Sequence, residues 1–535
     1  MDSTIKILPN YKKYNSYIDD IKKKTNPIML SGLTDSGKVH FAYSTHFYTE
    51  RPMLIITYNE IQAKKIMKDL AYFTTDTLFF PKREIFAYDY LAESKETYFN
   101  RMNVLNHLQN GTAKVIVTTI EALMQKMIAK ETLYRNCLEL KVGETAKLND
   151  LKETLVEMGY ERYDLVEGAS QFSVRGGILD IAVSEKIGVR IEFWGDEIDS
   201  IRNFDLATQR STEMLNQIKI YPSTEFLLES SRQTVIESIL KRKDYLEEDI
   251  KQIEEGDYTS KIDRYFNNFY TKQETFLDYL PQDILVFLDE ASKIKARSEN
   301  ILKDSRAFLK SLTEKEKILP DTILNLDDYI AFLDKIKNKQ TIYLERQDIG
   351  FIDKQTMHAK RNGYSFSYRE VNFFRSSMDL LFEEVQKAII AEKNIIILGG
   401  SSENSKKIAE NLEQRGIKNK WQEILEEEPT AGIVYVTTGV MSTGFESYDF
   451  NLLVISGEEL FTAPKKRKAS SSAFKQGETV VYSDLKPGDF VVHRSQRNRS
   501  VFRSKHNRGR WNYKRLHQNK IQRRRCVIYP NKPIR

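Results

Sequence analysis

The residues best suited to chemistry lie in a loop typical of phosphate binding. Residues 32–38 fit the pattern G-x-x-x-x-G-K, in which backbone N–H groups and the lysine hold phosphate oxygens. Asp289 and Glu290 follow an apolar run, as do the acidic residues that position Mg²⁺ and water in nucleotide hydrolases. This chemistry would be the hydrolysis of a nucleoside triphosphate. The candidate residues are Gly32, Thr34, Ser36, Gly37, Lys38, Asp289 and Glu290.

Two features argue against that activity. A phosphate-binding loop normally continues with Ser or Thr, whose hydroxyl binds Mg²⁺, but this chain continues with Val39. A helicase also needs a second lobe with an arginine that reaches the γ-phosphate, and residues 365–460 lack the Q-x-x-G-R-x-G-R motif that carries it. We therefore expect a retained fold element with no catalytic residue, no metal and no cofactor. Whether the loop still binds a nucleotide stays open.

The segments around the loop indicate a parallel α/β architecture. Apolar runs such as residues 53–58 alternate with stretches whose apolar residues recur every three to four positions. Such alternation produces a parallel sheet covered by helices. Residues 126–220 instead alternate at period two between Gly-rich turns, which indicates an antiparallel α+β insert. We predict a RecA-like P-loop lobe over 1–125, the insert over 126–220, the return of the first lobe over 221–362, a second, smaller α/β lobe over 363–462, a basic linker over 463–480 and a small β domain over 481–535.

Composition favours a globular protein of the reducing cytoplasm. No apolar run reaches the ~20 residues of a membrane helix, and two cysteines cannot form a disulfide framework. The net charge of +6 comes from the C-terminal segment, because residues 494–535 hold 15 Lys and Arg and no Asp or Glu. The remainder is mildly acidic, so composition provides no argument for a broad DNA-binding face.

Three motifs resemble the bacterial transcription-repair coupling factors (Mfd). They are the degenerate loop G-x-T-x-S-G-K, an insert with R-G-x-x-L-D and R-x-E-F-[WF]-G-D-E-I-[DE]-S-[IL]-R-x-F-D, and L-K-x-G-D-[YF]-V-V-H ending at His493. The excision-repair helicase UvrB shares the first two motifs. UvrB, however, keeps the Ser or Thr after the loop lysine, and its long Tyr-rich hairpin has no room after Pro81. The resemblance covers residues 1–493.

The resemblance implies that the insert binds the repair protein UvrA. Arg175 in SVRGGILD, and Arg190 and Trp194 in VRIEFWGDE, match the family's UvrA-contacting positions. Two arginines on adjacent strands with an aromatic anchor are residue types enriched in interaction hot spots. Without the resemblance, each arginine would be a solvated strand residue paired with an acidic residue of segment 192–197.

The resemblance also implies parts that lie beyond this chain. Family members continue with a CarD- or Tudor-like domain that contacts RNA polymerase and with a DNA-translocating motor that uses ATP and Mg²⁺. We expect this chain to stop inside the polymerase-interacting domain and no longer to bind RNA polymerase, and we expect its DNA binding to be weak or nonspecific. We predict a non-catalytic adaptor that recruits UvrA to lesions at stalled RNA polymerase during transcription-coupled nucleotide excision repair. The alternative is a UvrB-like DNA-dependent ATPase or helicase.

The family pattern is lost after His493. The family continues with Glu-x-His-Gly-Ile-Gly-[RK]-Tyr, whereas this chain has an arginine-rich segment with interleaved Phe502, Trp511 and Tyr513. One interpretation is a nucleic-acid-binding tail. We favour a shifted reading frame, because dropping one base from compatible codons restores Glu-Val-Asn-Gly-Ile-Gly-Arg-Tyr. Such a tail is expected to be disordered.

Overall fold

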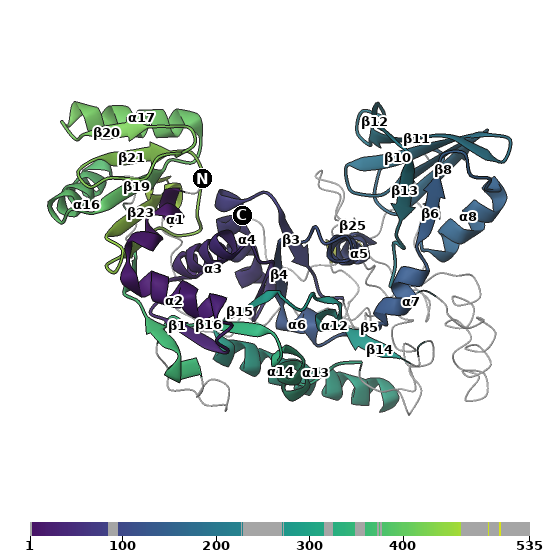
Figure 1. The fold of residues 1–535 in the computed structure, drawn as a ribbon, viewed down its shortest axis with the longest axis horizontal. Coiled ribbons are helices and arrows are strands. Elements are labelled where there is room, and N and C mark those ends of the chain that lie inside the picture. Colours follow the sequence, from purple (N-terminus) through teal and green to yellow (C-terminus); the bar gives the residue numbers. More distant parts are fainter. Residues whose placement is uncertain are drawn as a thin grey trace. The chain divides into compact units, whose positions relative to one another are not determined.

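The computed structural model describes most of the chain. The described residues are 3–83, 95–225, 227, 270, 272–314, 325–347, 359–371, 374, 377–461, 490–491 and 502–503. The chain divides into two compact units, residues 1–464 and residues 465–535. Within the first unit, one seven-stranded and two six-stranded sheets carry the architecture (Figure 1). The prediction of a multidomain α/β protein is confirmed at this level.

The seven-stranded sheet is parallel and buried. Its order is β17-β1-β16-β15-β2-β4-β3, and every neighbouring pair is parallel. Its five inner strands are buried along nearly their whole length, as expected of apolar runs covered on both faces. The chain builds this sheet from segments before residue 120 and after residue 284. The strands are β1 (Ile28–Ser31), β2 (Met53–Thr57), β3 (Thr77–Phe80), β4 (Val115–Thr119), β15 (Leu285–Asp289), β16 (Gln340–Leu344) and β17 (Gly363–Ser365).

Alternate residues along the strands of the seven-stranded sheet pack into two separate apolar cores, one on each face of the sheet. Leu54 and Ile116 pack on one face with α5, α6, α12, α13 and α14, whereas Ile55 and Val117 pack on the other with α2, α3 and α4. The short strands β5 (Lys126–Ile128) and β14 (Gln273–Thr275) pair beside the first of these cores. The helices are α1 (Ser3–Lys6), η1 (Leu8–Asn10), α2 (Lys12–Lys22), α3 (Asp35–Thr49), α4 (Glu60–Phe73), α5 (Lys95–Gln109), α6 (Ile120–Leu123), α7 (Lys130–Arg135), α12 (Phe276–Tyr279), α13 (Ala291–Glu314) and α14 (Tyr329–Ile336).

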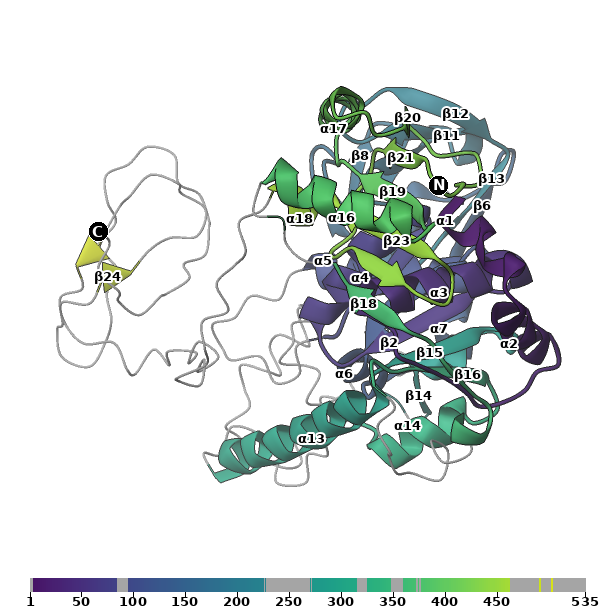
Figure 2. The same cartoon turned by 90° about the vertical axis from the view of Figure 1, so that its left-hand side faces the viewer.

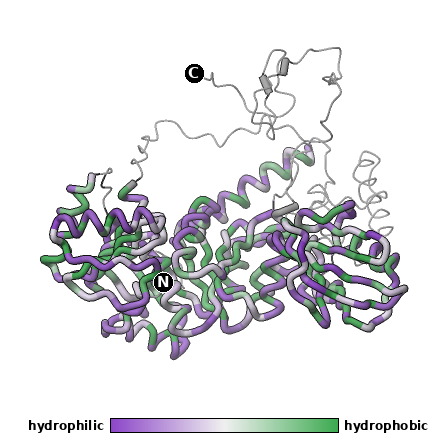
Figure 3. Tube along the Cα trace, turned by 90° about the horizontal axis from the view of Figure 1, so that it is seen from above, coloured by the Kyte–Doolittle hydropathy of each residue, from purple (hydrophilic) through white to green (hydrophobic). Residues whose placement is uncertain are grey.

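The first six-stranded sheet lies within the predicted insert and has the order β12-β11-β10-β9-β8-β7. Val189 and Ile191 of β10 are buried in a core with Leu151 and Leu155 of α8, while Arg190 between them is less buried. This alternation of hydrophobic and hydrophilic residues along the strands is visible in Figure 3. The elements are α8 (Leu148–Glu157), β7 (Glu161–Arg162), β8 (Gln171–Arg175), β9 (Ile178–Ala182), β10 (Ile187–Trp194), β11 (Glu197–Asp205) and β12 (Ser211–Leu215).

The chain enters and leaves this region through two paired strands. β6 (Leu138–Lys141) and β13 (Gln217–Ile220) are antiparallel, with Leu138 opposite Ile220. Both strands contribute to the core beneath the six-stranded sheet through Leu140 and Ile220. The two connections to the rest of the chain therefore lie side by side.

The second six-stranded sheet belongs to the predicted second α/β lobe and has the order β18-β22-β23-β19-β21-β20. One face packs against α16 and α17, and Figure 2 shows α16 on the viewer's side of this sheet. The other face shares an aromatic-rich core with α2 and α3 of the seven-stranded sheet. The elements are α16 (Met378–Ile390), α17 (Ser402–Gln414), α18 (Gly457–Phe461), β18 (Tyr368–Glu370), β19 (Asn394–Leu398), β20 (Asn419–Trp421), β21 (Val434–Thr437), β22 (Phe445–Ser447) and β23 (Leu452–Ser456).

The second unit is described at four residues only. β24 (Phe490–Val491) and β25 (Phe502–Arg503) form an antiparallel pair. The basic linker, most of the predicted β domain and the remainder of the arginine-rich tail lie outside the described residues. Residues 84–94 also lie outside the described residues, so the expected absence of a UvrB-like hairpin after Pro81 stays a prediction.

A buried charge cluster connects the residues that follow β13 with the region of the seven-stranded sheet around β3 and α5. Glu225 is fully buried and accepts hydrogen bonds from Arg83 Nη1 at 3.1 Å and Arg101 Nη2 at 3.2 Å. Arg101 also donates to the carbonyl of Pro81 at 2.7 Å and stacks on Phe80. Burial alone would raise the pKa of Glu225, but the two guanidinium groups hold it below its usual value.

We predict that Glu225→Gln lowers the free energy of unfolding by about 3 kcal/mol, because it removes the charged carboxylate that the two buried guanidinium groups share. Urea denaturation of the purified chain would measure this loss. The matched control is Glu139→Gln, which removes an exposed partner of Lys219 and should cost less than about 1 kcal/mol. Equal stability of the two variants would contradict a structural role for the cluster.

Candidate functional site

One face of the sheet β7–β12 is polar and holds the predicted arginines. The opposite face packs on α8, β6 and β13. Residues directly opposite each other in antiparallel strands share a face, and the register aligns one row across five strands. This row is Ser173 of β8, Asp180 of β9, Arg190 of β10, Arg202 of β11 and Met214 of β12.

A buried carboxylate holds both predicted arginines on this face. Asp180 is 1% exposed. It accepts hydrogen bonds from Arg190 Nε at 2.7 Å and Arg190 Nη2 at 2.9 Å, and from Arg175 Nη2 at 2.7 Å. These hydrogen bonds raise the pKa of Arg190 and fix the direction of its guanidinium plane. Within the described residues, Arg175 uses one donor in this way and Arg190 uses two, so further N–H groups remain for a partner.

Two expectations about these arginines need correction. The arginines do not lie on adjacent strands, because β9 separates β8 from β10. Nor do they pair with acidic residues of segment 192–197, since both bind Asp180 instead. Sequence reasoning missed Asp180, although the period-two alternation of ILDIA places it on the polar face between the two arginines.

The Arg190 guanidinium also makes a cation–π contact with an aromatic ring. Its guanidinium carbon lies 4.8 Å from the ring centroid of Phe204, which belongs to β11. The ring occupies the space above Gly188, and a Cβ atom at Gly188 would collide with the Phe204 ring. A glycine at this point of β10 is therefore required by the packing that supports Arg190.

Trp194 lies farther along β10 on the same face. A register shift between Glu192 and Phe193 precedes it, after which Trp194 pairs with Glu197. Its side chain is 82% exposed. An exposed aromatic side chain next to oriented arginines is a combination of residue types typical of protein-binding surfaces. We call this surface the arginine face; it comprises Arg175, Asp180, Arg190, Glu192 and Trp194.

The predicted phosphate loop connects β1 to α3 and is filled by contacts within the chain. Lys38 is 3% exposed and donates to Asp289 Oδ1 at 2.8 Å and to Glu290. Although burial alone lowers the pKa of Lys38, the two carboxylates raise it above its ordinary value. The Thr34 hydroxyl accepts from the Gly37 N–H at 3.2 Å and caps α3. The lysine that would hold a phosphate therefore already has two buried anionic partners.

The backbone of residues 366–368 covers the loop. Phe366 N–H donates to the carbonyl of Ser31 at 2.8 Å, and Tyr368 N–H donates to Gly32 at 3.1 Å. Gly32 has a φ of +79°, and any Cβ atom there would collide with the Phe366 carbonyl oxygen. Beside the loop, a cavity of about 10 Å³ remains between Lys38, Asp289 and neighbouring apolar residues. That space accommodates at most one water molecule.

Ser36 and Val39 also face the protein interior. The Ser36 hydroxyl donates to Asp69 of α4 at 2.8 Å, and the Ser442 hydroxyl donates to the same carboxylate at 2.9 Å. Val39 is 2% exposed and belongs to the apolar core beneath α3. Each of these side chains thus contributes to packing between the two α/β lobes or within the first.

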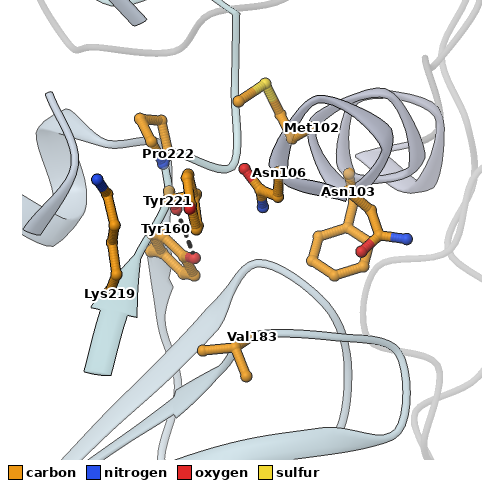
Figure 4. Close-up of a pocket in the computed structure, with 9 residues that line it drawn as sticks. Met102, Asn103, Asn106, Tyr160, Val183, Lys219, Tyr221 and Pro222 are labelled. Atoms are coloured by element: carbon orange, nitrogen blue, oxygen red, sulfur yellow. Dashed lines mark hydrogen bonds between the residues drawn. The ribbon is translucent and has the colours of Figure 1, made fainter. Parts of the chain in front are cut away.

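A second small cavity lies where α5 meets the residues around β13. It measures about 30 Å³ and contains room for about one water molecule. Within the described residues, Asn106 Oδ1 is buried there without a hydrogen-bond partner, while the Tyr160 hydroxyl donates to the Tyr221 carbonyl at 2.8 Å (Figure 4). The lining residues are Phe99, Met102, Asn103, Asn106, Tyr160, Val183, Lys219, Tyr221 and Pro222.

Two kinds of feature are absent from the described residues. None of the helices in the described ranges is long and apolar enough to cross a membrane. Nor does this part of the chain contain a group of three His, Cys, Asp or Glu side chains arranged to hold a metal ion.

Comparison with known proteins gives a consistent assignment. The family described as the UvrB interaction domain matches residues 138–226, which include the whole arginine face. The transcription-repair-coupling factor of Bacillus subtilis (strain 168) is 29% identical over 515 residues, covering 92% of this chain and 43% of the relative. Those of Staphylococcus aureus (strain bovine RF122 / ET3-1) and Staphylococcus epidermidis (strain ATCC 12228 / FDA PCI 1200) are 26% and 25% identical, covering 87% and 89% of this chain and 41% and 42% of the relatives. The chain spans about two fifths of the length of these curated relatives.

A buried carboxyl near the loop predicts a pH dependence of stability. Glu345 accepts the Ala291 N–H at 2.9 Å, and burial raises its pKa from 4.5 to about 7. The folded state therefore binds this proton more tightly than the unfolded state, and stability falls as pH rises from 4.5 to about 7. Glu345→Gln keeps the acceptor and removes the titration. We expect the variant to gain about 2 kcal/mol relative to the parent between pH 5 and pH 8.

Urea denaturation at the two pH values would measure this difference. Asp69 and Glu459, whose pKa values burial raises to about 6 and about 7, are present in both proteins, so their contributions cancel. A stability difference that is the same at pH 5 and pH 8 would contradict the assignment to Glu345.

Proposed function

We propose that this chain, which corresponds in sequence to the N-terminal part of the transcription-repair coupling factors, binds UvrA through the arginine face. The observation that carries the proposal is the pairing of Arg175 and Arg190 with one buried carboxylate, inside the segment that matches the UvrB interaction domain. A partner carboxylate would meet guanidinium groups that are already oriented. Association would then cost little side-chain entropy.

The chemistry of the arginine face defines what UvrA must present there. Arg175 and Arg190 share the single carboxylate of Asp180, so a carboxylate of the partner would accept charge-assisted hydrogen bonds from their remaining N–H groups. Trp194 would enter an apolar pocket, as buried aromatic anchors do at interface hot spots. Arg190 is only 17% exposed, so it would contribute mainly by contacting the partner edge-on, whereas Arg175 at 48% is more accessible.

The cellular role follows from this partner. The chain would act as an adaptor in transcription-coupled nucleotide excision repair, recruiting UvrA to lesions where RNA polymerase has stalled, and it would work in the cytoplasm. We further infer that the seven-stranded sheet is a RecA-like lobe, which its parallel order around β1 and α3 supports. A CarD- or Tudor-like polymerase-binding domain around residues 481–493, and weak or nonspecific DNA binding, remain inferences from the family.

We also propose that the phosphate loop is structural and takes neither ATP nor Mg²⁺ in this chain. The geometry that supports this is the pairing of Lys38 with Asp289 and Glu290, together with the Phe366 carbonyl over Gly32. A triphosphate would have to break the Lys38 ion pairs and move the Phe366 carbonyl away from Gly32. It would also lack the hydroxyl ligand for Mg²⁺ at Val39.

The UvrA proposal predicts a loss of binding when the arginine face is altered. Arg175→Ala, Arg190→Ala and Trp194→Ala should each weaken binding by about tenfold, because each removes a central contact. Isothermal titration of the purified chain with purified UvrA would give the dissociation constants. The matched control is Arg415→Ala, since Arg415 also pairs with an aspartate, Asp379, and stacks on a Phe ring, but on α16 and α17.

Unchanged affinity of all three variants would refute this interface. Weakening by Arg415→Ala to the same extent would point to a general effect of arginine removal. Melting temperatures measured on the same samples would exclude loss of folding as the cause.

The structural proposal for the loop predicts an effect on stability. Lys38→Met should lower the free energy of unfolding by about 3 kcal/mol, because the buried Asp289 loses its cationic partner and Glu290 keeps only the more exposed Lys293. Lys68→Met, which removes the exposed partner of Glu458, should cost less than about 1 kcal/mol. Mg-ATP should leave the melting temperature of the parent chain unchanged. DNA-stimulated ATP hydrolysis that disappears in Lys38→Met would instead support the UvrB-like ATPase.

A further inference from the structure

We propose that the UvrA-binding face extends beyond the arginine face to Arg202 and Met214, and that the UvrA surface covering it is acidic with an apolar hollow at Met214. This inference rests on the proposed function. It starts from the register, which places Met214 opposite Arg202 and Arg202 opposite Arg190. All three side chains therefore lie on one face of the sheet.

Arg202 adds a further oriented cation to this face. Its Nη2 atom pairs with Glu192, and the Ser200 hydroxyl donates to the second oxygen of Glu192 at 2.9 Å. The carboxylate is thereby held from two sides, as Asp180 is. Arg202 is 28% exposed and Glu192 is 31% exposed, so a partner can reach both.

The charge of the extended face favours an acidic partner. Three guanidinium groups, those of Arg175, Arg190 and Arg202, face two carboxylates, those of Asp180 and Glu192. These five side chains together carry a net positive charge, and Glu197, which lies opposite Trp194, adds a carboxylate only at the end of β10 away from Arg202 and Met214. Charge complementarity of this kind selects a partner and accelerates association.

Met214 supplies a second apolar anchor at the edge of the sheet. Its side chain is 65% exposed on β12, an edge strand of the sheet. Strand geometry places Met214 about 10 Å from Arg190 across the sheet and Trp194 about 13 Å from Arg190 along β10. Trp, Met and Arg are the residue types enriched at protein interfaces. Two apolar anchors around a charged centre thus fit within one interface of ordinary size.

The test uses the full chain and purified UvrA in isothermal titration at 0.1 M and 0.5 M salt. Met214→Ala and Arg202→Gln should each raise the dissociation constant about fivefold. Met214→Glu should weaken binding about tenfold more than Met214→Lys at low salt, because only the acidic variant repels an acidic partner. The difference should shrink at high salt. Val156→Ala and Val156→Glu are the controls, since Val156 is a 51% exposed apolar residue of α8, on the opposite side of this sheet.

The outcomes separate this inference from the proposed function. Dissociation constants within about twofold of the parent for Met214→Ala and Arg202→Gln, with binding weakened about tenfold in Trp194→Ala, would overturn the extension and leave the arginine face intact. A larger loss for Met214→Lys than for Met214→Glu would overturn the acidic partner surface. Absence of UvrA binding by the parent chain would overturn the proposed function and the extension with it.

Discussion

The seven-stranded sheet depends on the buried pairing of Lys38 with Asp289 and Glu290. The lysine belongs to α3, whereas Asp289 ends β15 and Glu290 follows it, so the pairing joins segments separated by the whole insert. Burying these charges is costly, and the pairing offsets that cost only while all partners are in place. The lysine at the end of the phosphate-loop pattern thus has two partners within the chain itself. Closure of the loop by residues 366–368 then attaches the second α/β lobe to the same point.

An ion pair with a nearly buried carboxylate also occurs on the arginine face, but there the cation is partly exposed. In both places a nearly buried carboxylate orients a cation, but Lys38 is enclosed whereas Arg175 is half exposed. Loss of one member of an enclosed pair destabilises the fold, whereas a partly exposed pair leaves donors for another molecule. The degree of enclosure around similar ion pairs thus separates a structural contact from a candidate binding surface.

Local sequence patterns predicted the elements more successfully than the contacts between them. Continuous apolar runs such as 53–58 and the run that precedes Asp289 became buried parallel strands, and period-two alternation placed Arg190 and Trp194 on one face of β10. Asp180 and the cover over Gly32 were missed. The pairing of Asp180 with the two arginines depends on which strands are neighbours in the sheet. The cover over Gly32 depends on contacts between residues more than 300 positions apart. Residue spacing along the chain carries little information about either.

The paired strands β6 and β13 have a consequence for how such proteins change over evolution. Because Leu138 and Ile220 lie opposite each other, the chain between them begins and ends at neighbouring points. A segment with adjoining ends can be gained, lost or exchanged by a single genetic event without breaking the sheet from which it emerges. The fold thereby combines the frame of the seven-stranded sheet with an insert whose two ends adjoin.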